Sequence, residues 1–279
     1  MKRVIINAIG GLANRMRAIL SARQLAQDTG RSLQVIWYLD KGCNIEINRL
    51  FDTTAFDFDV HMPSAGEYLL KYELPRKKNC YISALYQRRM LSFLENSNDL
   101  INQESSLKEI VSSSSKDVYV AAGTEFYDFD HELFKWGGVF VPSAEIVAEL
   151  GGDMLFDSKK TIGVHIRRTD NVASISNSPT EAFINKMNDF LAEDGELRFF
   201  LATDDQLTKN AIVDCFGRER IITNERKATR STADGMKDAW CDMIRLSRTK
   251  LILGSYYSSF SEVASYLGGV RLEIINTGA

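Results

Sequence analysis

The second half of the chain alternates short apolar runs with segments of helical period, and this alternation restricts the possible folds more than any other feature. The apolar runs predict buried strands, and the periodic segments between them predict helices. The expected strands are 161–166, 197–203, 220–223, 251–254 and 270–275, and the expected helices are 183–191, 206–216, 235–248 and 259–267. Strands that alternate with helices predict a doubly wound α/β domain with a parallel sheet.

The N-terminal stretch shows the same pattern once. Residues 3–9 form an apolar run, Gly10 and Gly11 interrupt it, and apolar residues then recur at helical spacing as far as Gly30. A second apolar run, 33–38, completes a strand–helix–strand unit. A parallel sheet is therefore expected at the start of the chain as well.

The chain length of 279 residues suits two domains of moderate size. Residues 40–130 give no clear pattern, whereas Pro142 can begin a helix. We place the junction there, which predicts an N-terminal α/β domain at 1–141 and a C-terminal ligand-binding domain at 142–279.

Composition excludes several classes of protein. The net charge of −3 offers no basic field for nucleic acid, so a bound anion needs a local cluster of cations. The four cysteines form no C-x-x-C pair and the three histidines are scattered, so neither a zinc site nor disulfides are expected. The first residues do not read as a signal peptide and no apolar run approaches membrane-spanning length. The expected location is the cytoplasm, with peripheral membrane contact left open.

Polar clusters follow several of the expected strands, where ligands bind in doubly wound sheets. In GVHIRRTD, residues 163–170, His165 and Arg167 share one face of the strand. Arg167 and Arg168 are costly neighbours unless an anion or carboxylates meet them. A diphosphate would serve, because guanidinium groups match phosphate oxygens; ion pairs with Asp170 and another carboxylate are the structural alternative.

Acidic residues form two further clusters. Asp204 and Asp205 follow the strand 197–203 and could cap the next helix, pair with the arginines or bind a metal. Capping or arginine pairing is favoured, because no spacer separates the two carboxylates. Asp242 lies among apolar residues and needs a partner, which is either Arg245 or a ligand with two adjacent N–H donors, such as guanine.

Serines and glycines mark two more candidate positions. Ser259 and Glu262 match a helix capping box, and the same helix N-terminus could bind phosphate through other serines nearby. Near the N-terminus, GGLANR at 10–15 is neither the dinucleotide fingerprint nor a P-loop. Its two glycines would still let the backbone approach a ligand closely.

Taken in order, GVHIRRTD, RFFLATDD, CDMIRLS and YYSSF resemble the donor-binding half of the α-(1→6)-fucosyltransferases, which include the nodulation fucosyltransferases. GGLANR resembles the Gly-rich loop that opens those proteins. The likeness covers residues 160–275 and 3–37. It implies an α/β fold of GT-B type: two Rossmann-like doubly wound domains, the first abbreviated, with the donor in the cleft between them.

The resemblance also implies a function: an inverting, metal-independent transfer of fucose from GDP-fucose to a glycan acceptor. By that likeness Arg167 binds the diphosphate and Arg168 assists. The implied donor-binding residues are Gly10, Gly11, Asn14, His165, Asp170, Asp204, Asp205, Asp242, Ser258, Ser259 and Phe260.

The general base is not assigned by the resemblance. The animal core fucosyltransferases, which belong to the same family, carry a Glu shortly after the H-x-R-R-x-D motif, but residues 171–175 contain no carboxylate here. Asp170 and Glu181 are the nearest candidates. Two alternatives stay open: a different GDP-sugar such as GDP-mannose as donor, and a non-catalytic protein that binds a nucleotide or glycan.

Overall fold

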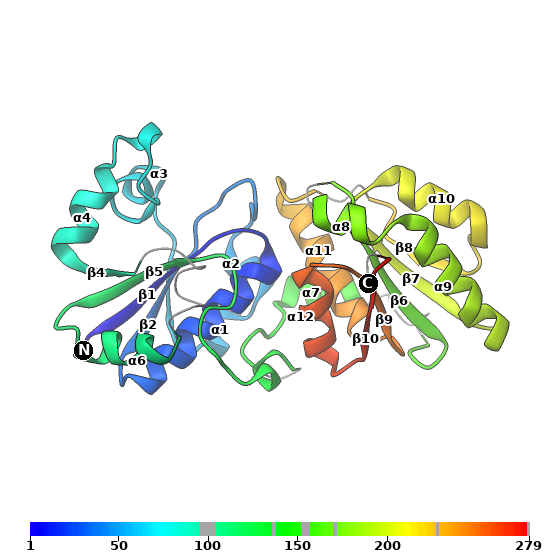
Figure 1. Ribbon diagram of the computed structural model, residues 1–279, viewed down its shortest axis with the longest axis horizontal. Coiled ribbons are helices and arrows are strands. Elements are labelled where there is room, and N and C mark those ends of the chain that lie inside the picture. Colours follow the sequence, from blue (N-terminus) through cyan, green and yellow to red (C-terminus); the bar gives the residue numbers. More distant parts are fainter. Residues whose placement is uncertain (95–103, 136–137, 152–156, 170–171, 227–228, 278–279) are drawn as a thin grey trace. The chain divides into compact units, whose positions relative to one another are not determined.

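The computed structural model describes residues 1–94, 104–135, 138–151, 157–169, 172–226 and 229–277 (Figure 1). The chain divides into two compact units. Unit 1 comprises Met1–Ile47 and Thr54–Asp130, and unit 2 comprises Asn48–Thr53 and His131–Ala279. Among the described residues no helix is long and apolar enough to cross a membrane.

Unit 1 is built on a parallel sheet whose strands, as far as the structure describes it, run in the order β3-β2-β1-β5-β4. The central strand β1 (Arg3–Ala8) is buried from Val4 onward, as expected for a parallel strand covered on both faces. The other elements, in chain order, are α1 (Leu12–Asp28), β2 (Ser32–Ile36), α2 (Ile47–Leu50), η1 (Thr53–Ala55), β3 (Asp59–His61), α3 (Ala65–Glu67), η2 (Tyr68–Tyr72), η3 (Lys77–Asn79), α4 (Ile82–Met90), β4 (Leu91–Leu94), α6 (Glu104–Ser113) and β5 (Asp117–Ala122). Most of α2 and the first residue of η1 are assigned to unit 2, because Asn48–Thr53 belong to that unit.

Unit 2 has a second parallel sheet, with described strands in the order β10-β9-β6-β7-β8. Its elements are η4 (His131–Phe134), α7 (Ala144–Leu150), β6 (Thr161–Ile166), α8 (Val172–Asn177), α9 (Thr180–Glu193), β7 (Arg198–Thr203), α10 (Gln206–Phe216), β8 (Ile221–Thr223), α11 (Ala233–Leu246), β9 (Ile252–Ser255), α12 (Ser259–Gly268) and β10 (Leu272–Ile275). Figure 1 shows α9 and α10 on one side of this sheet and α11 and α12 on the other. The predicted doubly wound fold is confirmed.

The core of unit 2 is formed by strand residues that face its helices. Ile162, Val164 and Ile166 of β6 are fully buried with Phe199 and Leu201 of β7. Burial of each such side chain stabilises the fold by about 1.5–3 kcal/mol. This core holds β6 in place, and so fixes the position of the residues that follow it.

Close packing of α12 on β9 depends on Gly254. A Cβ atom at this position would lie 2.8 Å from Ser261 Oγ and 2.8 Å from Leu272 Cδ1, so any other side chain would push the helix or the neighbouring strand away. The glycine thereby brings the N-terminus of α12 against the end of β9.

Two sequence expectations differ from the structure. The division falls at His131 rather than at Pro142, because His131 stacks on Tyr266 of α12 with ring centroids 4.2 Å apart and Phe134 also packs there. The first domain was expected to be abbreviated, but its sheet is not smaller than that of unit 2, since both sheets have five described strands.

Candidate functional site

The candidate site lies at the carboxyl ends of β6 and β9, the neighbouring strands at which the strand order of unit 2 reverses. Ligands bind at this switch point in doubly wound sheets. Ser255, at the end of β9, joins the two strands. Its Oγ accepts a hydrogen bond from the Arg167 backbone N–H at 3.1 Å and donates to the His165 carbonyl at 3.3 Å. The backbone from which Arg167 projects is therefore fixed.

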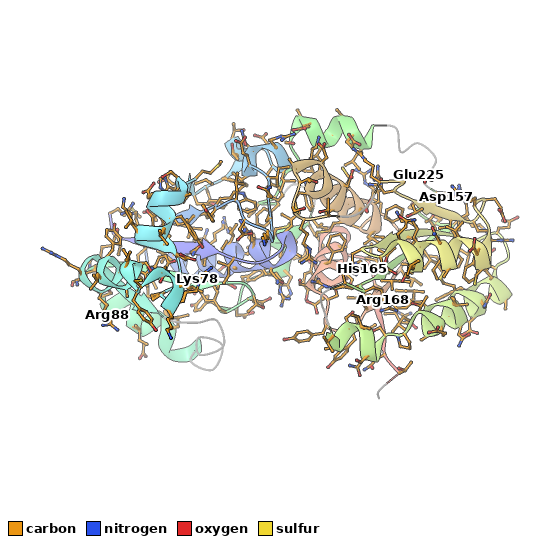
Figure 2. All side chains as sticks on the ribbon, turned by 90° about the horizontal axis from the view of Figure 1, so that it is seen from above. Lys78, Arg88, Asp157, His165, Arg168 and Glu225 are labelled. Atoms are coloured by element: carbon orange, nitrogen blue, oxygen red, sulfur yellow. The ribbon has the colours of Figure 1, made fainter. Side chains whose placement is uncertain are left out.

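His165 is a buried imidazole at this point, with only 8% of the residue exposed (Figure 2). Its ring stacks on Phe260 of α12 with centroids 4.7 Å apart. The pKa of His165 is lowered to about 3, chiefly by burial; Asp204 opposes the shift, and the positive charges of Arg167 and Arg230 contribute to it. The imidazole is neutral near pH 7. Among the described residues its Nδ1 has no hydrogen-bond partner, so it can bond to a ligand.

Arg168 directs its guanidinium group into the chain. Nη2 donates to the Ser178 carbonyl at 2.5 Å and to Thr180 Oγ1 at 3.1 Å, Nε donates to Thr180 Oγ1 at 3.2 Å, and Nη1 donates to the Arg167 carbonyl at 2.9 Å. Partial burial lowers its pKa. Among the described residues, which do not include Asp170, these partners are neutral oxygens and not the internal carboxylates of the structural alternative. The bonding favours a role in shaping the loop after β6.

The two carboxylates after β7 have different tasks. Asp204 Oδ1 accepts from the Arg168 backbone N–H at 2.7 Å, and Oδ2 accepts from Thr169 Oγ1 at 2.7 Å. Asp205 is the N-cap of α10: its Oδ2 accepts from the Thr208 N–H at 2.8 Å and from the Thr208 hydroxyl at 2.7 Å, which lowers its pKa. Asp204 thus binds the loop of the arginines, and Asp205 stabilises a helix end.

The N-terminus of α12 is the third part of the site. Its N-cap is Ser258, whose side chain makes no capping bond and whose buried Oγ has no partner among the described residues. The predicted capping box at Ser259 and Glu262 is wrong, because Ser259 is the first residue of the helix and not its N-cap. A helix start with an unpartnered buried hydroxyl is well suited to an anion.

Asp242 on α11 has its own set of charged neighbours. Arg245 Nη1 bonds to Oδ1 at 3.3 Å, and 16% of the Asp242 side chain is exposed. Its pKa is raised to about 7, chiefly by burial; Arg245 and Lys209 oppose the shift, and the negative charge of Asp238 contributes to it. The charged groups that shift the pKa of Asp242 are not those that shift the pKa of His165, although both residues belong to unit 2.

The remaining expected residues belong to unit 1 or lie outside the described residues. Gly10, Gly11 and Asn14 belong to unit 1, where Gly10 has a φ of +85° and Gly11 is the N-cap of α1. Asp170 lies outside the described residues. Among those that are described, no group of three His, Cys, Asp or Glu side chains is arranged to hold a metal ion.

Sequence reasoning did not identify three residues that build these loops. Ser255 joins β6 to β9, and Ser178 bonds Arg168 through its carbonyl while its Oγ donates to Ile275 and accepts from the Tyr256 N–H. In unit 1, the fully buried Arg15 donates to the carbonyls of Gly10 and Tyr38 and pairs with Asp40. In the sequence, these three residues are marked only as polar residues close to a strand end or a glycine turn, which does not indicate their bonding partners.

No protein-family model matches the sequence, and no curated protein matches it. Solved structures do match. The apo form of POFUT1 superposes with a TM-score of 0.61 at 13% identity, over 98% of this chain and 97% of that one. NodZ alpha-1,6-fucosyltransferase soaked with GDP-fucose gives 0.60 at 17% identity, over 96% and 93%.

A mutant of Arabidopsis thaliana FUT1 in complex with GDP gives a TM-score of 0.62 at 15% identity, over 98% of this chain and 70% of that one. These three structures share their architecture with the present chain over nearly its whole length. At this level of identity the likeness concerns architecture. The chain therefore has the α/β fold of the GT-B fucosyltransferases.

Proposed function

We propose that this chain is a fucosyltransferase that transfers fucose from GDP-fucose to a glycan hydroxyl with inversion. The observation that carries the proposal is the geometry at the switch point of unit 2. There a buried neutral His165 and the backbone-anchored Arg167 lie at the end of β6, and Ser258, whose hydroxyl has no partner among the described residues, follows the end of β9. The fold supports it, because structures of this fold include complexes with GDP and GDP-fucose.

Arg167 has the central role in this proposal. In the transfer, the acceptor oxygen forms a bond to C1 of the sugar while the bond from C1 to the diphosphate oxygen breaks, and the acceptor proton goes to a base. Negative charge then develops on the departing GDP. A fixed donor aimed at developing charge lowers a barrier by about 3–4 kcal/mol. The positively charged guanidinium of Arg167 would stabilise this negative charge, so the proposed reaction requires no divalent metal.

The N-terminus of α12 would bind the same diphosphate. Free backbone N–H groups at a helix start attract anions, and the Ser258 hydroxyl is available to donate. Arg168 and Asp204 act as positioning residues, because they tie the loop that carries Arg167 to α9 and β7.

The guanosine end of the donor is assigned to His165 and Asp242. Phe260 already covers one face of the His165 ring, and Nδ1 is left for a ligand. Asp242, when ionised, can accept two hydrogen bonds from the N–H groups of guanine. Its pKa of about 7 leaves it partly protonated in the free protein, so donor binding would select the ionised form.

Donor turnover tests the proposal. Release of GDP from GDP-fucose and from GDP-mannose is measured with a panel of glycan acceptors. Wild type should transfer fucose, and Arg167→Ala should lower kcat by about 10²–10³ while its melting temperature stays close to that of wild type. If GDP-mannose is turned over faster than GDP-fucose, the transferred sugar is mannose and not fucose. GDP binding without transfer to any acceptor, or an active Arg167→Ala, would contradict catalysis by this site.

A further inference from the structure

Unit 1 presents an exposed surface that combines hydrocarbon side chains with cations. We call it the basic–apolar surface; it is formed by residues 69–89, from η2 through α4. Apolar side chains here are unusually exposed, with Leu85 at 75% and Leu70 at 51%. The other exposed apolar residues of the segment are Leu69, Tyr81 and Ile82. Single exposed apolar side chains are ordinary, but five within one short segment are not.

The same segment concentrates positive charge. It contains six cations and one carboxylate, Glu73, although the whole chain has a net charge of −3. The cations are Lys71, Arg76, Lys77, Lys78, Arg88 and Arg89. Glu73 is shared by Arg76 at 3.1 Å and Lys78 at 3.8 Å, and Lys71 pairs with Glu67 just outside the segment at 3.0 Å. The segment therefore keeps a positive excess, to which Lys77, Arg88 and Arg89 contribute. Figure 2 labels Lys78 and Arg88 on this part of unit 1.

A strained turn at Cys80 and Tyr81 connects the cations at 76–78 to the exposed apolar side chains of α4. Cys80 and Tyr81 have consecutive positive φ values, 53° and 57°, which are unfavourable for residues with a Cβ. The buried Asn79 fixes this turn, because its Oδ1 accepts from the N–H groups of Arg76 and Tyr81. Tyr81 is thereby kept 56% exposed next to α4.

The first turns of α4 continue the surface. Ile82, Leu85 and Arg89 recur at helical spacing and are all exposed. Gln87, on the other side of the helix, is buried and donates to the carbonyls of Lys71 and Glu73. The helix therefore packs on η2 with its polar Gln87 and turns leucine and isoleucine toward solvent.

We propose that the basic–apolar surface docks the chain on an anionic phospholipid surface. Charge complementarity selects an anionic occupant, and the aliphatic side chains select hydrocarbon. Leu and Ile insert at the boundary of the acyl chains, Tyr81 suits the headgroup level, and long cations reach the phosphates. Nucleic acid is disfavoured, because only one of the five exposed apolar residues offers a ring for stacking. The inference does not depend on the proposed activity.

Sedimentation of the full chain with vesicles tests this proposal. We expect binding to vesicles of phosphatidylglycerol and phosphatidylcholine, weaker binding to phosphatidylcholine alone, and weaker binding at about 0.5 M than at about 0.1 M salt. Each lost cation should weaken binding about fivefold, so K77Q/K78Q should weaken it about 25-fold. L70Q/L85Q should weaken it by about tenfold or more.

Matched controls come from unit 2. K159Q/K250Q removes two exposed lysines outside the surface, and Leu207→Gln replaces a leucine that is 78% exposed. Both should bind vesicles as wild type does, and all variants should keep the wild-type melting temperature. The proposal is overturned if anionic vesicles do not bind the chain, if neutral vesicles bind it equally, or if the controls weaken binding as much as the surface variants. Each of these outcomes would leave an acidic protein as the next occupant to test.

Discussion

The buried imidazole of His165 makes the stability of unit 2 depend on pH in a way that one substitution can isolate. The pKa is about 3 in the folded state against 6.5 in the absence of burial. The folded state therefore binds fewer protons than the unfolded state between these values. Stability from this residue is present above pH 6.5 and is lost progressively as the pH falls toward 3.

The size of the loss follows from linkage. Between pH 7 and pH 5 the unfolded imidazole goes from about one-quarter to almost fully protonated, while the folded one stays neutral. At 1.36 kcal/mol per pH unit and per proton, the free energy of unfolding falls by about 2 kcal/mol over this range. Asp242 changes stability in the opposite direction, because burial raises its pKa to about 7.

Urea denaturation of wild type and His165→Gln at pH 5, 6 and 7 measures this contribution. The variant is expected to be less stable at pH 7 because it disturbs the stack on Phe260, and only wild type carries the imidazole. The contribution of Asp242 cancels in the difference. The stability difference between the two proteins should shrink by about 2 kcal/mol from pH 7 to pH 5. A difference that is constant with pH would refute a buried, neutral His165.

Three further predictions concern the residues around this site. Arg168→Met should lower the free energy of unfolding by about 2 kcal/mol in urea denaturation, because charged donors to Ser178 and Thr180 are lost; an unchanged value would remove the positioning role. GDP should bind about tenfold more weakly at pH 6 than at pH 8, because Asp242 takes up a proton over this range. Calorimetry should find most of this pH dependence absent in Asp242→Asn, in which only the ionisation of GDP itself remains. Gly254→Ala should lower the free energy of unfolding by about 1–3 kcal/mol, since its Cβ would crowd Ser261, and a thermal melt equal to that of wild type would contradict this packing.

The sequence was most informative where local periodicity decides the structure. The strand expected at 161–166 is β6 (Thr161–Ile166), and the helix expected at 206–216 is α10 (Gln206–Phe216). Both are regular apolar patterns bounded by polar residues. By contrast β5 (Asp117–Ala122) was not recognised, because it follows a serine-rich stretch and is fixed by long-range pairing with β1.

The candidate site was predictable in its residue types and only partly in its contacts. The ends of the expected strands indicated His165, Arg167 and Asp204 as candidates, and the charges of Arg167 and Asp204 both act on the pKa of His165. The bonds of Ser255 and Ser178 join segments that are remote in sequence, and no local pattern indicates them. For the same reason the internal bonding of Arg168 could not be read from the adjacent arginines.

Nucleotide selectivity tests the central claim, that unit 2 binds a GDP-sugar at the ends of β6 and β9 through Arg167. The measurement is the shift in melting temperature of wild type and Arg167→Ala with GDP, UDP, ADP and NAD. At about 100 times its Kd, GDP should stabilise wild type by about 2.7 kcal/mol, a shift of several degrees, and the variant should lose most of it. A shift with UDP or NAD in place of GDP, or an equal GDP shift in Arg167→Ala, would contradict the account.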